Sequence, residues 1–358
     1  MILSIAAVLF TFGLVIFLHE LGHFLVCKLT EIKVEAFSFG FGPELFGRTK
    51  GGTRYSIRAI PLGGYVKPAG ENIEEVTGHP DEYFSKPWYT RLGVVLAGPF
   101  MNYLLAFVIF TGVILIMGEP VPSADPVVGE LSQGYPAYEA GIKAGDRVLS
   151  VDGVQVKDWS QMADLIHKKP GASLLIEYNR GAEKLKVKVV AKKGPEGQGL
   201  IGIAPGISYK YVGALKAARM GVGQCYYWTK YTVTTLASNI RHREKPDLSG
   251  PIGIVNIVSK AAHTGMPDLF FLIALISVAI GFFNLLPIPL LDGGHAVLFI
   301  MEGVFRRKVT PRVMGWLNST GIAFLVGILI FATYSDIKRL MAPKAAPVQV
   351  ETPAQGKK

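Results

Sequence analysis

His19, Glu20 and His23 have the residue types and the spacing of a metal-dependent hydrolytic centre, because residues 19–23 read His-Glu-Leu-Gly-His. On a helix, side chains at positions i and i+4 share a face, so both imidazoles can bind one zinc ion. Glu20 lies next to the first ligand, where it can act as a general base toward a water molecule. The motif lies in an apolar run, where ionisable residues are costly and indicate a functional site.

A catalytic zinc site usually has three protein ligands and one open position, so another part of the chain must supply a third ligand. The segment 284–295 reads NLLPIPLLDGGH, and its two prolines interrupt an apolar run, which is tolerated where the backbone lines a cavity. Asp292 and His295 are both candidate ligands, and their residue types leave the choice open. Asn284 either hydrogen-bonds a substrate or joins two helices. Cys27 is interpreted as a small apolar residue at a helix end rather than a ligand.

Membrane-spanning helices must position these residues. Half of the 358 residues are hydrophobic and 18% are charged, whereas about 25% are charged in a typical soluble protein. The long apolar runs predict four transmembrane helices, which we place at residues 1–29, 93–118, 267–295 and 317–336. The first run lacks the basic residues and the cleavage site of a secretory signal peptide, so we expect it to span the membrane.

The segments between these helices predict which side of the membrane each loop faces and which small structures the loops form. Lys and Arg are concentrated in the loops 30–92 and 296–316, which the positive-inside rule places in the cytoplasm. Residues 53–60 alternate in polarity, as a half-buried strand does, and turn residues follow them. This pattern predicts a β-hairpin close to the membrane. Residues 207–266 are expected to form an extracytoplasmic amphipathic or linker region, and residues 337–358 a disordered tail. The net charge of +10 fits attraction to the lipid bilayer, and no pattern indicates nucleic-acid binding.

The segment 124–206 predicts a small extracytoplasmic domain of short strands and turns. Within it, residues 136–153 resemble the signature of a PDZ domain, a class that binds extended peptides or chain ends by strand addition. The expected fold class is therefore a polytopic α-helical membrane protein with four transmembrane helices, a membrane-associated β-hairpin loop and an inserted PDZ domain of mixed β and α structure.

Taken together, these motifs resemble those of the site-2 protease family of intramembrane zinc metalloproteases, most closely its bacterial branch of regulator-of-sigma-E proteases, which cleave anti-sigma factors. The resemblance covers nearly the whole chain, with HELGH at 19–23, FGFGP at 39–43, IPLGGYVK at 60–67, GPFMN at 98–102, SGPIGI at 249–254 and NLLPIPLLDGGH at 284–295. It implies that His19, His23 and Asp292 bind zinc and that Glu20 is the general base.

The resemblance also implies how a substrate is bound. The hairpin near residues 53–60 would be a membrane-reentrant loop that pairs with an unwound substrate helix, so we expect Tyr55, Ile57 and Asn284 to contact the substrate. Gly98 and Asn102, by contrast, have the spacing of a helix-packing pair, and we interpret them as architecture rather than chemistry.

Partners and location follow from the same resemblance. It implies single-span membrane proteins as substrates, either anti-sigma factors or remnant signal peptides, trimmed first by another protease. It implies a bacterial inner membrane location, with the PDZ domain extracytoplasmic and the active site toward the cytoplasm. Several relatives have tandem PDZ domains and this chain has one, which leaves a size-filter role open. The alternative is a membrane peptide-binding PDZ scaffold with a structural or vestigial metal site, although such a site would need no base at position 20.

Overall fold

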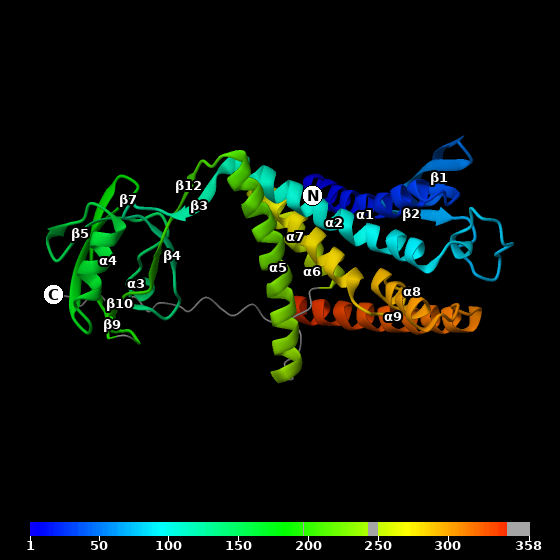
Figure 1. Ribbon diagram of the computed structural model, residues 1–358. Coiled ribbons are helices and arrows are strands. Elements are labelled where there is room, and N and C mark those ends of the chain that lie inside the picture. Colours follow the sequence, from blue (N-terminus) through cyan, green and yellow to red (C-terminus); the bar gives the residue numbers. More distant parts are fainter. Residues whose placement is uncertain (196, 243–249, 342–358) are drawn as a thin grey trace. The chain divides into compact units, whose positions relative to one another are not determined.

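The structure of the protein is a computed structural model that describes residues 1–195, 197–242 and 250–341 (Figure 1). The chain divides into two compact units. The membrane unit comprises residues 1–113 and the chain from Leu215 onward, and the insert comprises Ile114–Ala214. Most of the tail expected over 337–358 lies outside the described residues.

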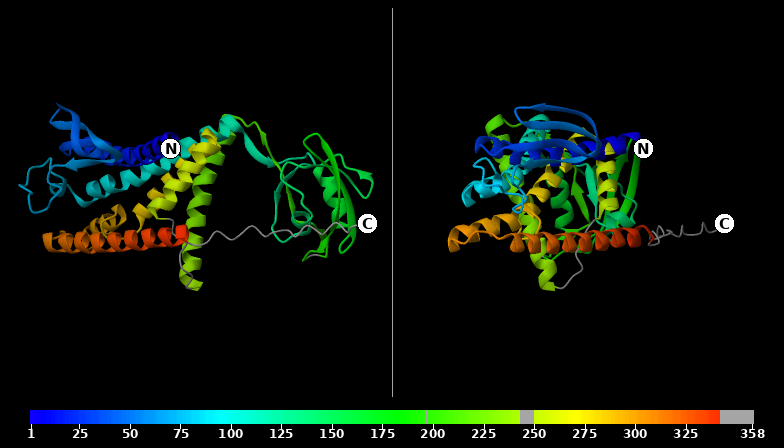
Figure 2. Two further views of the ribbon diagram at one scale, coloured as in Figure 1. Left: turned by 180° about the vertical axis from the view of Figure 1, so that it is seen from behind. Right: turned by 90° about the vertical axis from the view of Figure 1, so that its right-hand side faces the viewer.

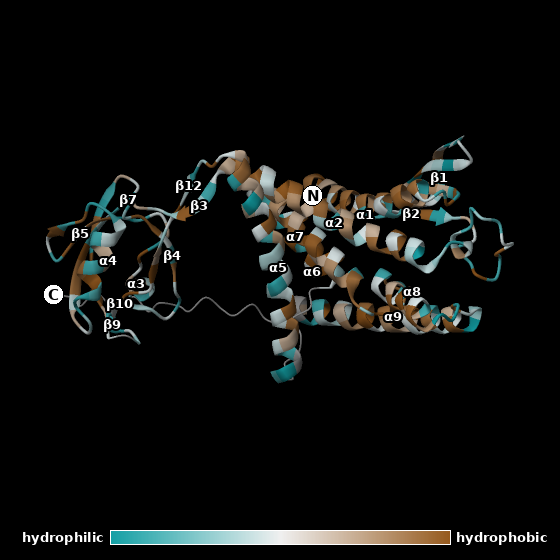
Figure 3. Ribbon diagram, in the orientation of Figure 1, coloured by the Kyte–Doolittle hydropathy of each residue, from teal (hydrophilic) through white to brown (hydrophobic). Residues whose placement is uncertain are grey.

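Among the described residues, four helices are long and apolar enough to cross a membrane. They are α1 (Ile2–Leu29), α2 (Trp88–Met117), α7 (Met266–Leu285) and α9 (Pro311–Met341). The most apolar 18-residue stretch of each has a mean hydropathy between 1.8 and 2.4, and apolar residues are prominent along the helices (Figure 3). Such surfaces are stable against lipid or other apolar side chains, so the prediction of four transmembrane helices is confirmed. α2 and α9 begin before the expected positions 93 and 317, because each helix continues beyond its apolar run.

α1 and α2 lie next to each other in Figure 1 and in the left view of Figure 2. Gly22 permits this close approach, because a Cβ atom there would lie only 2.3 Å from the carbonyl oxygen of Ala97. α1 also packs on α6 (Pro251–Thr264) and on α7 through a buried core that includes Val15 and Ile273. The first transmembrane helix is therefore held on several sides by other helices.

The helix α5 (Ala214–His242) covers part of the region expected to be amphipathic. Trp228 lies edge-on to Phe271 of α7, with ring centroids 6.3 Å apart. The hydroxyl groups of Thr229 and Tyr103, the latter on α2, are 3.0 Å apart. In the structure α5 packs on the membrane helices α2 and α7.

The third apolar run does not form one continuous helix. α7 ends at Leu285, and a new helix, α8 (Asp292–Phe305), begins after a turn over residues 286–291. The two prolines in this turn cannot donate the hydrogen bonds of a continuing helix. Gly293 is required there, because a Cβ atom would lie 2.2 Å from a backbone carbonyl oxygen of the turn. The helix expected over 267–295 therefore stops early, and Asp292 becomes the first residue of α8.

The chain after α1 forms a curled antiparallel sheet from β1 (Val34–Lys50) and β2 (Thr53–Pro68). Both strands bend, so that residues 54–57 lie between residues 36–39 and 46–49. Within the described part of the chain, residues 64–68 pair on one side only, with residues 34–39. The sheet is therefore larger than the hairpin expected at 53–60, and residues 64–68 form an edge of it.

A folded loop over residues 69–87, which contains the short helix η1 (Tyr83–Ser85), leads from β2 to α2. Glu82 is buried in this loop and accepts hydrogen bonds from the backbone N–H groups of Thr77 and Gly78 and from the Ser85 hydroxyl. The hydrogen bonds from Thr77, above all that of its hydroxyl, lower the pKa of Glu82 to about 2. The loop is thus a defined structure that carries Tyr83 to the cavity described below.

The insert has its own hydrophobic core. Its main sheet is antiparallel, with the strand order β6 (Val154–Gln155), β5 (Arg147–Val151), β7 (Ser173–Arg180) and β8 (Glu183–Val190). The helix α4 (Trp159–His167) contributes Met162 to a core that also contains Val148 and Ile176. Asp158 caps α4 by accepting a hydrogen bond from the backbone N–H of Gln161.

Three short strand pairs and the helix α3 (Pro136–Glu139) complete the insert. The pairs are β4 (Val128–Leu131) with β11 (Ile203–Pro205), β9 (Lys192–Lys193) with β10 (Gly199–Leu200), and β3 (Glu119–Pro122) with β12 (Ile207–Lys210). In the last pair Glu119 faces Lys210, so the two ends of the insert meet. This pairing extends the unit beyond the expected limits of 124–206.

Candidate active site

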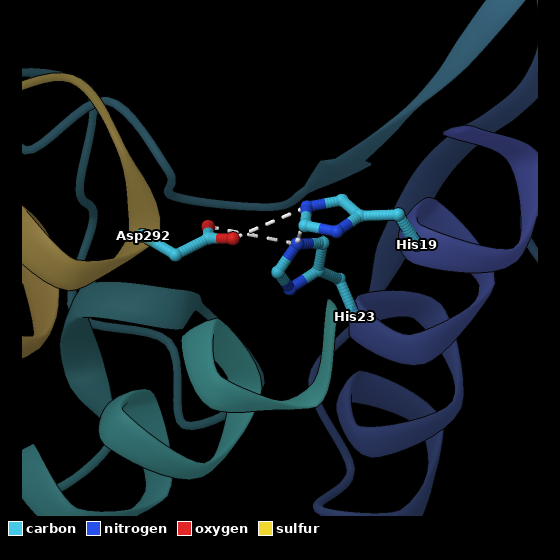
Figure 4. A group of neighbouring side chains, drawn as sticks. All are labelled: His19, His23 and Asp292. Atoms are coloured by element: carbon cyan, nitrogen blue, oxygen red, sulfur yellow. Dashed lines mark hydrogen bonds and ion pairs between the residues drawn. The ribbon is translucent and has the colours of Figure 1, made fainter. Parts of the chain in front are cut away.

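His19 and His23 lie on one face of α1, and Asp292 reaches them from the first turn of α8 (Figure 4). The two Nε2 atoms are 3.1 Å apart. Asp292 Oδ2 lies 3.1 Å from His19 Nε2, and Asp292 Oδ1 lies 3.6 Å from His23 Nε2. Both histidines are buried. The broken third span therefore brings a carboxylate to the two imidazoles predicted from the H-E-x-x-H spacing.

These three side chains fit a zinc ion. With zinc–ligand bonds of about 2.0–2.1 Å, ligand atoms at a tetrahedral centre lie about 3.3 Å apart, which is close to the separations observed here. Two imidazoles and one carboxylate are a donor set of catalytic zinc sites, in which a fourth position stays open. Among the described residues, only His19, His23 and Asp292 converge in this way. His295 lines the same cavity but does not join the cluster, so the geometry favours Asp292 as the third ligand.

Glu20 and Asn284 line the same cavity as the cluster, which has a volume of about 500 Å³. Glu20 Oε2 accepts a hydrogen bond of 3.1 Å from the backbone N–H of Val66, on the edge segment 64–68. Tyr65 and Val66 also line the cavity. The edge of the curled sheet is therefore part of the site wall.

Tyr55 and Ile57, both expected to contact substrate, do not line this cavity. The Tyr55 ring lies against Phe24 and Phe37, with centroid distances of 6.0 and 6.5 Å, and Ile57 is 52% exposed. They belong to residues 54–57, which have a neighbouring strand on each side. They lie away from it because β1 and β2 bend and place a later segment at the edge, which the sequence does not reveal, and their contact with substrate stays a prediction.

Gly98 and Asn102 of α2 belong to the site, although the sequence indicated helix packing. A Cβ atom on Gly98 would lie 2.3 Å from His23 Nε2, so the imidazole rests directly on this glycine. Val94, one turn earlier on the same face, accepts a hydrogen bond from His23 Nδ1 at 2.7 Å through its carbonyl oxygen. Asn102 Nδ2, one turn later, lies 3.2 Å from His19 Nδ1. The spacing of four residues between Gly98 and Asn102 is visible in the sequence. It is the same whether the two residues pack against a helix or support the imidazoles.

A buried ion pair fixes the far end of α8. Arg91 at the start of α2 pairs with Glu302 at 2.5 Å, and both side chains are nearly inaccessible to water. The Arg91 guanidinium lies over the rings of Phe84 and Phe299 at 5.1 and 4.7 Å. Glu302 also accepts a hydrogen bond from the backbone N–H of Val309. This pair ties the helix that carries Asp292 to the helix that supports both histidines.

Comparison with known proteins defines the class to which this site belongs. Residues 7–328 match the family model of Peptidase family M50, so the chain belongs to this family, that of the site-2 proteases. A protein of Clostridium acetobutylicum provisionally named a zinc metalloprotease is 36% identical over 338 residues, which cover 93% of this chain and 97% of that protein. The zinc metalloprotease RasP of Geobacillus kaustophilus is 30% identical over 417 residues, covering 94% and 98%.

A third relative, the regulator of sigma-W protease RasP of Bacillus subtilis, is 28% identical and covers 94% of this chain and 99% of its own length. The chain is therefore an integral membrane zinc metalloprotease. Over 23% of its length the chain is similar to a solved PDZ domain of an SdrC-like protein from Listeria monocytogenes, with 26% identity, a TM-score of 0.21 and coverage of 88% of that domain.

Proposed function

We propose that the protein cleaves peptide bonds within or beside the transmembrane segments of single-span membrane proteins, at a zinc ion held by His19, His23 and Asp292. The convergence of these three ligand atoms from α1 and α8 is the observation that carries the proposal. The cavity beside them is large enough for a segment of extended peptide.

The reaction would be hydrolysis of an amide bond. When bound, zinc would polarise the scissile carbonyl group and supply a nucleophilic water at neutral pH. Glu20 would take the proton from the attacking water and later donate it to the leaving amine. The hydrogen bond from Val66 N–H holds one oxygen of this carboxylate in place, so the base is oriented before the substrate arrives.

The edge segment 64–68 supports a role in substrate binding. A transmembrane helix hides its amide bonds, so the substrate must unwind before cleavage, and its freed backbone groups then need partners. Tyr65 and Val66 line the cavity at an edge where a further strand can be added. Asn284, also in the cavity wall, would hydrogen-bond the unwound chain. We therefore place the substrate contact at Tyr65 and Val66 instead of Tyr55 and Ile57.

The insert would select chain ends. Its groove, about 300 Å³ in volume, lies between α4 and the segment 199–204 and is lined by apolar residues such as Met162, Ile166 and Ile203. An apolar groove beside a strand suits the extended end of a partly trimmed substrate. The scaffold alternative would use the same groove without any cleavage.

We infer the substrates and the location from the names of the relatives and from the charge pattern. The name of the Bacillus subtilis relative, regulator of sigma-W protease, supports anti-sigma factors as substrates here, with remnant signal peptides as a second group and prior trimming by another protease. The basic loops 30–92 and 296–316 would face the cytoplasm of a bacterial inner membrane. The insert follows α2, so it would lie on the opposite, extracytoplasmic side.

Glu20→Gln tests the proposal. The amide keeps the size of the side chain but cannot accept a proton, so zinc content should be unchanged and cleavage of a single-span substrate in proteoliposomes should fall by at least about 100-fold. Undiminished cleavage would refute the role of Glu20. Binding of the same substrate is measured beside cleavage for the unmodified protein and for Glu20→Gln. The scaffold alternative predicts that both proteins bind the substrate and that neither cleaves it. A soluble peptide of the same sequence shows whether the enzyme needs a membrane-embedded substrate.

A further inference from the structure

Glu71, three residues beyond the edge segment 64–68, is an acid of the cavity wall that the proposed reaction does not use. It lines the same cavity as Glu20 and the three clustered side chains. The residue is exposed, and its carboxylate makes no hydrogen bond or ion pair with another residue in the part of the chain that the structure describes. One carboxylate of the cavity wall is therefore available to a ligand.

The surroundings of Glu71 favour a cation as its partner. Although the residue is exposed at the cavity, the protein around it displaces water, and this burial raises the pKa of Glu71 to about 7. Lys67 lowers the pKa, but its Nζ is paired with Glu35 Oε2 at 2.8 Å, and the Glu35 charge raises the pKa again. The charge of Lys67 is thus shared with another acid. A cation that a ligand brings would stabilise the ionised form of Glu71.

The charges in the cavity wall point the same way. Among the described residues that line the cavity, Glu20, Glu71 and Asp292 are acidic, and none is Lys or Arg. When bound, a zinc ion would balance the charges of Glu20 and Asp292, because the two histidine ligands are neutral. The carboxylate of Glu71 is the charge that remains. A cationic group is therefore the ligand that complements the rest of the cavity.

A transmembrane substrate carries such a group at its cytoplasmic end. The positive-inside rule gives the cytoplasmic flank of a membrane segment an excess of Lys and Arg, and the proposed orientation places the loop 30–92, with Glu71, on that side. Glu71 follows Val66 by five residues, so at most about 18 Å of chain separates it from the site wall at Glu20. Gly70, at φ +64°, turns the chain between them. A basic residue a few positions from the scissile bond can therefore reach Glu71.

We propose that Glu71 is a specificity-determining residue that binds a Lys or Arg side chain in the cytoplasmic flank of the substrate's transmembrane segment. The inference rests on the proposed function, which supplies the substrate class. Both basic side chains donate charge-assisted hydrogen bonds to a carboxylate. The ion pair would fix the register of the substrate strand along the edge segment 64–68. It would thereby determine which peptide bond lies beside Glu20.

Cleavage kinetics in vesicles of neutral phosphatidylcholine test the proposal, because anionic lipid would itself attract a basic flank. The substrates are three forms of one single-span protein, with two Lys, two Gln or two Glu residues in the cytoplasmic flank. The unmodified enzyme should cleave the Lys form with a kcat/KM about 5-fold to 30-fold above that of the Gln form. The difference should appear in KM, because an ion pair remote from the scissile bond stabilises substrate and transition state equally.

Variants of the enzyme show whether Glu71 causes this preference. Glu71→Gln keeps the size of the side chain and removes its charge, so it should cleave the Lys and Gln forms equally. Glu71→Lys should reverse the preference and cleave the Glu form better than the Lys form. Glu74→Gln is the matched control. Glu74 is an exposed acid of the same loop that does not line the cavity, so its removal should leave the preference for Lys unchanged.

A purely structural role of Glu71 would change cleavage of all three substrates alike and would not reverse the preference. A preference for Lys that persists in Glu71→Gln would overturn the inference, as would its loss in Glu74→Gln. If Glu71→Lys does not fold, the comparison of Glu71→Gln with the unmodified enzyme still decides.

Glu20→Gln in the same assay separates the inference from the proposed function. Undiminished cleavage by Glu20→Gln refutes the proposed function and this inference with it. Loss of cleavage in Glu20→Gln, together with a preference that does not depend on Glu71, refutes the inference alone.

Discussion

The two halves of the proposed zinc site are held in different ways. His19 and His23 lie between two closely packed helices, and α2 contacts their rings through Gly98 and two hydrogen bonds. Asp292 begins a helix that follows an irregular turn, and the ion pair of Glu302 anchors the other end of that helix. The first half depends on contacts with the ligands themselves, and the second on contacts several turns away.

This difference teaches where the site tolerates change. A substitution under the imidazoles displaces ligand atoms directly, because packed helices cannot move apart without loss of many contacts. A substitution that affects α8 acts through the backbone, so Asp292 can partly adjust. We therefore expect losses of zinc affinity that are large in the first half and graded in the second.

The largest effect is expected for Gly98→Val. Its side chain would occupy the position of the imidazoles, since even a Cβ atom would lie 2.3 Å from His23 Nε2. The purified protein should contain almost no zinc by metal analysis. Gly112→Ala on the same helix is the control, because an added Cβ atom there meets no atom within 4 Å. A Gly98→Val protein with normal zinc content would contradict the platform role of α2.

The second-largest loss of zinc affinity is expected on removal of the proposed third ligand. Asp292→Asn replaces the anionic ligand with a weakly binding amide. Substitution of residues that only hold metal ligands in place lowers metal affinity by about 10-fold to 100-fold, so zinc affinity should fall here by at least about 10-fold. His295→Asn is the comparison, since His295 lines the cavity outside the cluster. If His295→Asn lowers zinc affinity more than Asp292→Asn does, the ligand assignment is wrong.

A smaller effect on zinc is expected from the distant ion pair. Arg91→Met leaves the Glu302 carboxylate buried without its partner, which should cost about 3–5 kcal/mol of stability. Zinc affinity should fall less than in Asp292→Asn, because the ligand remains. The double variant Arg91→Met/Glu302→Leu removes the unpaired charge and should recover part of the stability, as measured by thermal unfolding. A normal Tm for Arg91→Met would show that the pair does not hold α8.

The smallest effect on the site is expected from the insert, a separate unit. Asp146 is buried and pairs with Arg180. Burial alone would raise the pKa of Asp146, but hydrogen bonds from Arg180 and from the backbone N–H of Lys143 outweigh it and lower the pKa. Because the pKa is lower in the folded state, this stabilisation is present above the unfolded value of about 3.9 and is lost at lower pH.

Arg180→Met should therefore destabilise the insert, because it leaves the buried Asp146 carboxylate without its partner. Hydrogen exchange of the insert's backbone amides in the full-length protein measures this loss. Zinc content should not change. Lys184→Met, which removes an exposed partner of Glu177, is the control and should alter exchange little. A loss of zinc in Arg180→Met would show that the two units are coupled.

The first half of the site was predictable because its spacing is local. An i, i+4 pair on an apolar helix places both histidines on one face wherever that helix packs. The four transmembrane helices were predictable for a similar reason, since length and hydropathy are properties of single segments. Asp292 could not be separated from His295 by residue type, because the choice depends on how residues 286–291 turn.

Two other features depended on tertiary structure. Gly98 and Asn102 are four residues apart, so they lie on one face of a helix. Such a face can pack against another helix or against the side chains of a site, and the sequence does not say which of the two lies opposite. The substrate-facing segment was placed at 53–60 because alternation marks a strand there. Alternation does not reveal which strand is at the edge, and the bending of β1 and β2 puts residues 64–68 in that position.

The pairing of β3 with β12 has a consequence for how such proteins can diversify. The insert enters and leaves through two adjacent strands, with Glu119 opposite Lys210. A module joined in this manner can be lost, exchanged or duplicated by recombination at two junctions that lie side by side in the fold. The helices that carry His19, His23 and Asp292 need not change their sequence. Natural selection can therefore change which substrates the insert selects without changing the residues that cleave them.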